Sequence, residues 1–410
     1  MVELRNWAGN FEYGAARLHR PANVGEIQEI VAGARRAKAL GTRHSFNAIA
    51  DTEADLISLE RLRGIAVDEE AGTVAVEGGV TYGELCRHLN ERGYAIHNLA
   101  SLPHISVAGA CATGTHGSGD RNGNLATAVA AMSVVTSNGE IARFSGGDLN
   151  GAAVHLGGLG VVVSLTLGIQ PAFPVAQTVY EDLPLDLVRG RFDEIMSGAY
   201  SVSLFTRWQE ARVDQVWVKR KDGEDPTASL GQRATEKRHP IRGIPPENCT
   251  EQLGVPGPWH ERLPHFQLDY MPSAGKELQS EYLIPRRHAA EALRAVGELG
   301  PMLDPILRIS EVRTMAGDEL WMSPANGRPT VGIHFTWVQD WARVREALPV
   351  VEERLAPFEA RPHWGKLFAM SGARLARLYP MRAGFRALLE RHDPEGKFRN
   401  AFLEEAVWRE

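Results

Sequence analysis

Apolar and polar positions in the first part of the chain alternate in a way that predicts strands interleaved with helices. Capping patterns predict the starts of two helices, one at Asn23–Glu26 that continues to Leu40 and one at Thr81–Glu84. The Asn138-Gly139 pair stands between apolar residues, which is typical of a β-hairpin. This region is therefore predicted to mix α and β structure.

The run after Gly158-Leu159-Gly160 argues against a Rossmann-type nucleotide site. Residues 160–169 are rich in β-branched side chains and bounded by glycines, which predicts a buried strand. A Rossmann site needs a third glycine and a helix whose N-terminus faces the pyrophosphate. This segment has neither feature, so we exclude that interpretation.

Residues 331–337 place apolar and polar side chains on opposite faces of a predicted strand. Gly332, His334 and Thr336 share the face opposite the apolar side chains. An exposed face would usually carry charged or long polar residues. The pattern therefore favours the wall of a cavity.

A second predicted strand, residues 308–314, carries Glu311 and Arg313 on one face. A carboxylate and a guanidinium at this spacing can brace each other and offer acceptors and donors to a hydroxyl-rich ligand. The spacing alone leaves open a salt bridge on the protein surface.

Lys366 follows the sequence His363-Trp364-Gly365 and precedes two apolar residues. An amine in such a partly dry position can act as a charge or, with a lowered pKa, as a base. The alternative is an ordinary lysine whose stem covers apolar surface.

Two loops made of small residues predict a large ligand. Residues 41–47 (GTRHSFN) and 102–119 (LPHISVAGACATGTHGSG) expose backbone N–H groups that can surround a phosphate or pyrophosphate. His44 in the first loop is expected to form hydrogen bonds. His116 in the second could contact a phosphate, brace the loop or take part in catalysis.

Length and composition exclude several classes of protein. A chain of 410 residues predicts two domains, and 43% hydrophobic with 23% charged residues is typical of a soluble protein. The net charge of −6 gives no reason to expect nucleic acid as a partner. No apolar run approaches the ~18 residues of a membrane span, and the N-terminal residues lack a signal-peptide pattern. We therefore expect a cytoplasmic protein without membrane contact.

Cysteine and histidine spacings add two expectations. The three cysteines show no C-x-x-C spacing, which favours a reducing compartment and no disulfide framework. The sequence lacks H-E-x-x-H and closely spaced His/Cys sets, so no metal site is expected. Residues 219–240 are charged and polar, which predicts an exposed loop.

The order of motifs along the chain resembles a known family. GTRHSFN comes first, NLASLPHISVAGACATGTHGSG second, and EVRT, HFTW, HWGK and DPEGKFRN follow. This order is similar to that of bacterial alditol oxidases, which are vanillyl-alcohol-oxidase-like flavoproteins with a p-cresol-methylhydroxylase-type FAD domain. The resemblance extends from Asn6 to Phe402 and includes the irregular segment ENCTEQLGVPGPWHERLPHF.

The resemblance implies FAD as cofactor, bound covalently by His44 through the 8α-methyl group of the isoalloxazine ring. No cysteine matches the second attachment seen in some relatives, so a single covalent bond is implied. The implied cofactor-binding residues are Gly41, Thr42, Arg43, His44, Ser45, Phe46, Asn47, Ser101, Ser106, Gly109, Thr113, Gly114, Thr115, His116, Gly117, Val162 and His363.

It also implies the substrate and the reaction. The terminal hydroxyl of an alditol such as xylitol or sorbitol would be oxidised to the aldose by hydride transfer to flavin N5, with O2 reduced to H2O2. Lys366 would polarise or deprotonate the reacting hydroxyl, and His334 is the alternative base. The implied substrate-binding residues are Ser101, Glu311, Arg313, Thr336 and Lys366.

The implied fold class is α+β. A two-subdomain FAD-binding domain of the p-cresol-methylhydroxylase type would span residues 1–171. A substrate (cap) domain on an antiparallel β-sheet with flanking helices would span 172–365, and residues 366–410 would return to the FAD domain. A monomer is expected.

Three other functions fit parts of the pattern. An aldonolactone (sugar-lactone) oxidase or dehydrogenase would share the FAD domain. A non-catalytic or sensory flavin-binding protein would bind the cofactor without being reduced by a polyol. A metal-dependent hydrolase would be sensitive to chelators and colourless.

Overall fold

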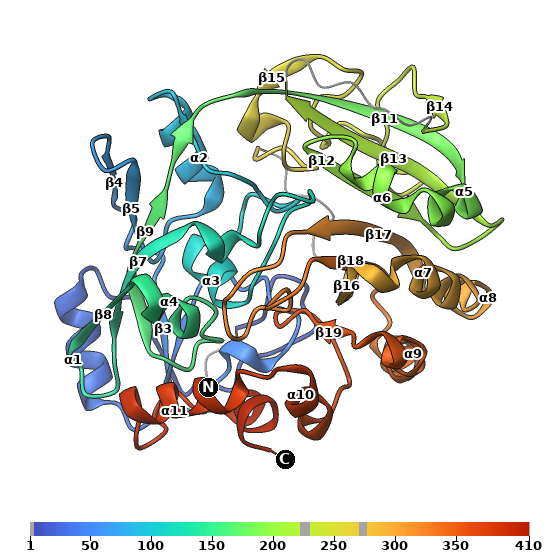
Figure 1. Cartoon of the computed structure of the whole chain (residues 1–410). Coiled ribbons are helices and arrows are strands. Elements are labelled where there is room, and N and C mark those ends of the chain that lie inside the picture. The colour runs from blue at the N-terminus through green and yellow to red at the C-terminus, as the bar shows by residue number, and fades with distance from the viewer. Residues whose placement is uncertain (1–3, 222–229, 270–276, 410) are drawn as a thin grey trace.

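The computed structural model describes residues 4–221, 230–269 and 277–409. Figure 1 shows the residues before about 172, in blue, cyan and blue-green, on one side of a large sheet in green and orange. The largest hydrophobic cluster contains residues of both parts, such as Val74 and Val331. The fold confirms the α+β architecture that the resemblance implied. The domain boundaries at residues 171 and 365 stay a prediction.

A small parallel sheet begins the N-terminal part. Its strands β1 (Arg17–His19), β3 (Asp55–Ser58) and β2 (Ala37–Leu40) lie in that order. Helix α1 (Val24–Gly33) begins as predicted, because the Asn23 side chain accepts from the backbone N–H of Glu26. Its predicted continuation to Leu40 was wrong. Ala34 is extended, and the following residues pair with β3 as a strand.

A five-stranded antiparallel sheet completes the N-terminal part. Thr81 and Glu84 form the predicted capping box at the start of α2. Gly139, at φ +82, closes the predicted hairpin, and the strand predicted at 160–169 is present. The sheet order is β4 (Ile65–Asp68), β5 (Thr73–Glu77), β9 (Val161–Gly168), β7 (Val129–Val135) and β8 (Ile141–Ser145). Other elements are α2 (Tyr82–Asn90), α3 (Val107–Ala112), α4 (Leu149–Ala152), β6 (Tyr94–Ala95) and β10 (Gln170–Pro171).

A nine-stranded sheet forms the second part. The prediction of an exposed loop over residues 219–240 was wrong at its start, since β13 continues to Lys221 and Lys219 is fully buried. Residues 222–229 lie outside the described residues. The order is β14 (Gln232–Arg233), β11 (Pro174–Pro184), β13 (Arg212–Lys221), β12 (Ser201–Thr206), β17 (Leu307–Met315), β18 (Thr330–Val338), β16 (Glu277–Pro285) and β19 (Arg361–Pro362), with β15 (Pro256–Pro258) beside β11.

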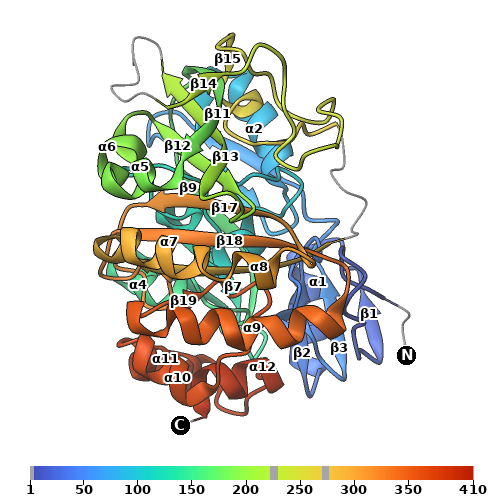
Figure 2. The same ribbon diagram turned by 90° about the vertical axis from the view of Figure 1, so that its right-hand side faces the viewer.

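Helices cover one face of this sheet (Figure 2). The apolar residues predicted on one face of 331–337 are fully buried there. Tyr282, the register partner of Ile333, donates its hydroxyl to Glu352 on α9, which places this face against the helices. The opposite face looks toward the N-terminal part. The helices are α5 (Leu185–Gly190), α6 (Phe192–Ser197), α7 (Ala289–Gly297), α8 (Gly300–Leu303) and α9 (Trp341–Leu355).

The C-terminal segment lies against the N-terminal part. It contains α10 (Gly372–Leu378), α11 (Arg382–His392) and α12 (Ala401–Leu403), red in Figure 1. The Asn400 amide donates to the carbonyl oxygens of Ala48 and Asp51 at 3.0 and 2.9 Å. The three cysteines are free and buried. Within the described ranges, no helix has the length and apolarity that a membrane crossing requires.

Candidate active site

A cavity of about 350 Å³ lies where the two small-residue loops meet the polar face of the nine-stranded sheet. A volume of this size is typical of ligand sites. Most residues singled out from the sequence converge on it. They are Gly41, Thr42, Arg43, His44, Ser45, Phe46, Ser101, Ser106, Gly109, Thr113, Thr115, His116, Val162, Glu311, Arg313, His334, Thr336, His363 and Lys366.

Asn47, Gly114 and Gly117 are absent from this wall. The Asn47 amide donates to the carbonyl oxygens of Trp364 and Lys366 at 2.8 and 2.7 Å, which ties the first loop to the lysine segment. A Cβ on Gly117 would approach the carbonyl oxygen of Leu99 to 2.3 Å, so close packing requires glycine there.

The first loop meets the second at Ser106. The backbone N–H of Ser106 donates to Thr42 Oγ1 at 3.2 Å, and a Cβ on Gly41 would lie 2.6 Å from Ser106 Oγ. Within the second segment, a Cβ on Gly109 would lie 2.8 Å from the same oxygen. The segment 102–119 is not a continuous loop, because Val107–Ala112 form α3, which Ser106 precedes as N-cap. Buried alanines and a cysteine pack this helix against the core.

His44 is held with one ring nitrogen engaged and the other without a partner. Its Nδ1 is 3.0 Å from Thr42 Oγ1, while Nε2 is buried and has no hydrogen-bond partner among the described residues. Trp7 stacks on the ring at a centroid distance of 5.3 Å. Burial, followed by the neighbouring His104, lowers the pKa of His44 to about 4, so the imidazole is neutral at pH 7.

Three strands place polar side chains in one row across the sheet. His334 on β18 pairs with Glu281 on β16 and with Glu311 on β17. Paired residues point to the same face of a sheet. Arg313 lies on that face, two residues beyond Glu311, and Thr336 lies two residues beyond His334.

Glu281 is the centre of this cluster. The carboxylate is fully buried and contacts Lys366 Nζ at 2.6 Å, a terminal guanidinium nitrogen of Arg313 at 2.8 Å and His116 Nε2 at 3.2 Å. Burial by itself raises the pKa of this carboxyl. Lys366, Arg313 and His116 outweigh burial, and the pKa lies well below its usual range. Glu281 is therefore ionised at neutral pH.

Lys366 connects this carboxylate to His334. Its Nζ is 2.7 Å from His334 Nδ1, and His334 Nε2 is 3.0 Å from Thr336 Oγ1. Burial lowers the pKa of Lys366, which Glu281 opposes. Burial and the charge of Lys366 lower the pKa of His334 to about 4. The imidazole is thus a neutral acceptor for a lysine hydrogen.

Glu311 and Arg313 are buried at the cavity and do not form a surface salt bridge. Arg313 Nε lies 3.6 Å from Glu311 Oε1, and the guanidinium also reaches Ser101 Oγ at 3.5 Å. Burial opposes ionisation of Glu311, but Arg313 and then His265 hold its pKa far below the usual range. The cavity wall thus offers both acceptors and cationic donors.

Sequence reasoning missed Glu281, His265 and Lys219. Glu281 carried a partial signal, because it shares one face of β16 with Glu277 and Gln279. Lys219 carried a weaker signal on β13, because its neighbours Val216 and Val218 lie on the opposite face of the strand. His265 lies in an irregular segment where no periodicity exists to place it.

These features fit a diphosphate-bearing flavin. The unpartnered His44 Nε2 and the close glycine backbones leave room for a bulky group beside the first loop. Among the residues that the structure describes, no group of three or more His, Cys, Asp or Glu side chains is placed to hold a metal ion.

Comparison with known proteins identifies the chain's relatives. A family model described as an FAD binding domain matches residues 15–145, and one described as D-arabinono-1,4-lactone oxidase matches 270–406. A cholesterol oxidase from Brevibacterium sterolicum superposes with a TM-score of 0.80 at 14% identity, over 98% of this chain and 96% of that one. Fold and cofactor domain therefore define an FAD-binding oxidoreductase.

The sequence relatives are more specific. An alditol oxidase from a Streptomyces species is 50% identical over 98% of this chain and 99% of that protein. An L-gulono-1,4-lactone dehydrogenase from Mycobacterium tuberculosis is 30% identical over 97% of each. The chain belongs to the alditol oxidase family.

Proposed function

We propose that this enzyme oxidises the terminal hydroxyl of an alditol, such as xylitol or sorbitol, to the aldose, with O2 as electron acceptor and H2O2 as product. The observation that carries the proposal is the convergence of Lys366, His334, Glu311 and Arg313 on the cavity that His44 also lines. The 50% identity to an alditol oxidase over nearly the whole chain supports the same substrate class.

The polar wall suits a chain of hydroxyl groups. The Glu311 carboxylate accepts hydrogen bonds, and the Arg313 guanidinium donates them. Thr336 does both and is fixed by its contact with His334. Together with Ser101, these side chains would place the terminal carbon of the polyol, and such positioning supplies much of the rate acceleration in a reaction of this type.

Lys366 and His334 would act as one acid–base unit. The ammonium of Lys366 donates to His334 Nδ1 at 2.7 Å and is held by Glu281 at 2.6 Å. Because His334 Nδ1 accepts from the lysine, Nε2 carries the ring hydrogen. A substrate hydroxyl at this pair would therefore lose its proton to Lys366 Nζ while the lysine passes one of its own to His334 Nδ1. The lysine charge would then stabilise the alkoxide as it forms.

FAD, when bound, would supply the hydride acceptor and the route by which electrons reach O2. We assign the covalent attachment to His44, because its neutral ring presents an unpartnered Nε2. Gly109 would hold the phosphates through its backbone N–H, and Ser106, Thr113 and Thr115 would do so through their hydroxyl groups, with Val162 contacting the cofactor through its backbone.

The absorbance spectrum of the purified protein tests this function. The protein should be yellow, and anaerobic addition of xylitol should bleach the flavin band. Admission of O2 should restore the band and release about one H2O2 per flavin reduced, since two electrons are transferred. A flavin that no polyol bleaches would contradict the proposal and favour a non-catalytic flavin protein.

An aldonolactone oxidase or dehydrogenase is the second candidate. It is favoured by the lactone oxidase model over residues 270–406 and by the 30% identical lactone dehydrogenase. Bleaching by L-gulono-1,4-lactone but not by xylitol would select it, and an artificial electron acceptor active where O2 is not would identify a dehydrogenase.

The proposal also concerns the setting in which the enzyme acts. We assign it to the cytoplasm, in keeping with three free, buried cysteines, and we expect a monomer. Sedimentation equilibrium of the FAD-loaded protein would test the monomer.

A further inference from the structure

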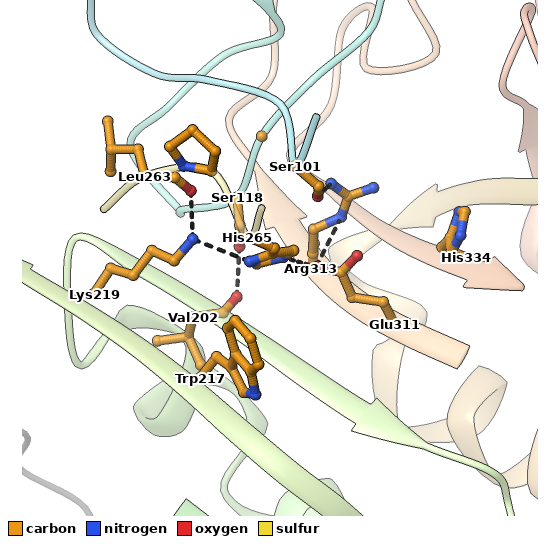
Figure 3. A network of polar contacts seen from close by, with 12 residues as sticks. Ser101, Ser118, Val202, Trp217, Lys219, Leu263, His265, Glu311, Arg313 and His334 are labelled. Carbon is orange, nitrogen blue, oxygen red and sulfur yellow. Dashed lines mark hydrogen bonds and ion pairs between the residues drawn. The ribbon is translucent and has the colours of Figure 1, made fainter. Parts of the chain in front are cut away.

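Lys219 is a buried cationic residue that the proposed reaction does not use. It lies on β13 and is fully buried. Its ammonium donates to the carbonyl oxygen of Leu263 and lies 3.1 Å from His265 Nδ1 (Figure 3). A lysine in this position carries a desolvation cost. Burial lowers its pKa to about 7.

Lys219, His265 and Glu311 form a chain of two hydrogen bonds in which Lys219 donates to His265 and His265 donates to Glu311. Glu311 is ionised and can only accept, so His265 Nε2, at 2.8 Å from Oε1, must carry a hydrogen. Burial and the charge of Lys219 lower the pKa of His265 to about 4, so the ring is neutral. Its Nδ1 then lacks a hydrogen and accepts from Lys219. Lys219 thus fixes the tautomer that donates to Glu311.

This arrangement determines which oxygen of Glu311 a ligand can use. Among the described residues, His265 and Arg313 both contact Oε1. Oε2 is the oxygen left to accept from a ligand hydroxyl in the cavity that Glu311 lines.

His265 also connects the sheet to the segment that carries Ser101. The backbone N–H groups of His265 and Phe266 donate to the carbonyl oxygen of Ser101 at 3.2 and 3.3 Å. Phe205 and Trp217 pack edge-on against the imidazole at centroid distances of 5.4 and 5.1 Å, which restrict its rotation. Figure 3 shows Lys219 and His265 between the strands and the loop that carries Ser101.

We propose that Lys219 and His265 are positioning residues that orient Glu311 toward the substrate, so that polyol affinity depends on Lys219, behind the cavity wall, and on His265, which lines the cavity beside Glu311. The proposal rests on the function proposed above. It requires neither residue to touch the substrate or the flavin.

Lys219→Met tests the proposal, since methionine keeps much of the side-chain volume and removes the donor. In the FAD-loaded enzyme, KM for xylitol should rise about tenfold, the loss expected for one charge-assisted hydrogen bond. The limiting rate of anaerobic flavin bleaching should change by less than about threefold, because the reacting groups stay in place. FAD content should be unchanged.

Lys397→Met is the matched control. Lys397 is also a buried lysine whose ammonium donates to a carbonyl oxygen, that of Val31 at 2.6 Å, but it does not line the cavity. This variant should change the thermal midpoint without changing KM. A rise in KM that matches Lys219→Met would show that the effect is structural and would overturn the proposal.

A pair of variants at His265 keeps the test decisive if Lys219→Met does not fold. His265→Gln retains an amide donor near Glu311, whereas His265→Leu does not. KM should rise about tenfold more in the leucine variant than in the glutamine variant. Equal KM values in the two variants would reject the positioning role. A wild-type flavin that xylitol fails to bleach would instead reject the proposed function.

Discussion

Glu281 on β16 and His334 on β18 are register partners in adjacent strands, and the ammonium of Lys366 bridges them at 2.6 and 2.7 Å. The sheet register therefore brings together a carboxylate and an imidazole that are far apart in sequence. Lys366 reaches them from the segment after β19, which pairs with β16. The positions of the acid–base groups therefore depend on the contact between β16, β18 and the segment after β19.

Removing the carboxylate at this junction should damage both stability and turnover. Glu281→Gln leaves the charges of Lys366 and Arg313 without their shared partner, and breaking a buried ion pair on one side costs about 3–5 kcal/mol. The thermal midpoint should fall, and adding Lys366→Met to this variant should restore part of it. Calorimetry of the single and double variants measures the fall in the thermal midpoint and its partial recovery, and steady-state kinetics with xylitol measures the loss of turnover.

Glu352→Gln provides the control for Glu281→Gln. Glu352 is also buried, but it lies on α9 and accepts hydrogen bonds from Tyr282 and the backbone of Ala369. Its replacement should leave KM for xylitol unchanged. A Glu281→Gln enzyme with wild-type stability and turnover would contradict the central role of this carboxylate.

Lys366 and His334 should show strongly non-additive effects on catalysis. Lys366→Met and His334→Gln are each expected to lower kcat by at least about 100-fold, the usual contribution of acid–base groups. Because one hydrogen bond joins them, the double variant should be about as slow as the slower single variant. Anaerobic bleaching rates, normalised to FAD content, measure this coupling. Additive losses would mean that the two residues act independently.

Covalent attachment makes a prediction about His44 that can be seen by eye. Acid-precipitated wild-type protein should stay yellow, whereas His44→Ala should release the colour to the supernatant. His392→Ala is the control, because His392 packs on Phe144 and does not line the cavity. Its pellet should stay yellow. Colour that washes off the wild-type pellet would exclude the covalent bond.

Local signals predicted individual elements of this fold correctly. The Thr81–Glu84 capping box and the Asn138-Gly139 hairpin are determined by residues close in sequence. The end of α1 was predicted wrongly, because residues 37–40 pair with β3, which their own sequence does not reveal. Tertiary pairing of this kind overrides local helix propensity.

The candidate site was predictable where strand alternation exposed it. Alternation placed His334 and Thr336 on a polar face, and the structure lines the cavity with them. The residues that neighbouring strands place beside His334 and Thr336 depend on the order of the strands in the sheet. β12 pairs with β17 across about a hundred residues of sequence, and no local pattern specifies such pairing. His265 therefore stayed unpredicted, and the role of His44 came from resemblance alone.

Acidification should destabilise the protein between pH 6.5 and 4. Burial lowers the pKa of His265 and His334 to about 4 in the folded state, against about 6.5 in the unfolded chain. The unfolded chain binds more protons within this window, so the free energy of unfolding falls as the pH falls. Each histidine should contribute about 2 kcal/mol of this loss by pH 5.

Chemical denaturation at pH 7.5 and pH 5 measures this loss. His265→Gln should reduce the difference in the free energy of unfolding between the two pH values by about 2 kcal/mol, since one titrating group is removed. Glu281 and Glu311 have lowered pKa values, so their stabilising effect is present above the usual carboxyl range and is lost only at more acidic pH. A free energy of unfolding that is equal at both pH values would contradict buried neutral imidazoles.

Gly41 tests how closely the two loops must approach to hold FAD. An added Cβ would meet Ser106 Oγ at 2.6 Å, so Gly41→Ala should push the loops apart and lower FAD content at least severalfold. Gly33→Ala is the control, because a Cβ there meets nothing within 4 Å and alanine favours the helix. The ratio of flavin to protein absorbance measures each variant, and a fully loaded Gly41→Ala enzyme would show that the loops tolerate a wider gap.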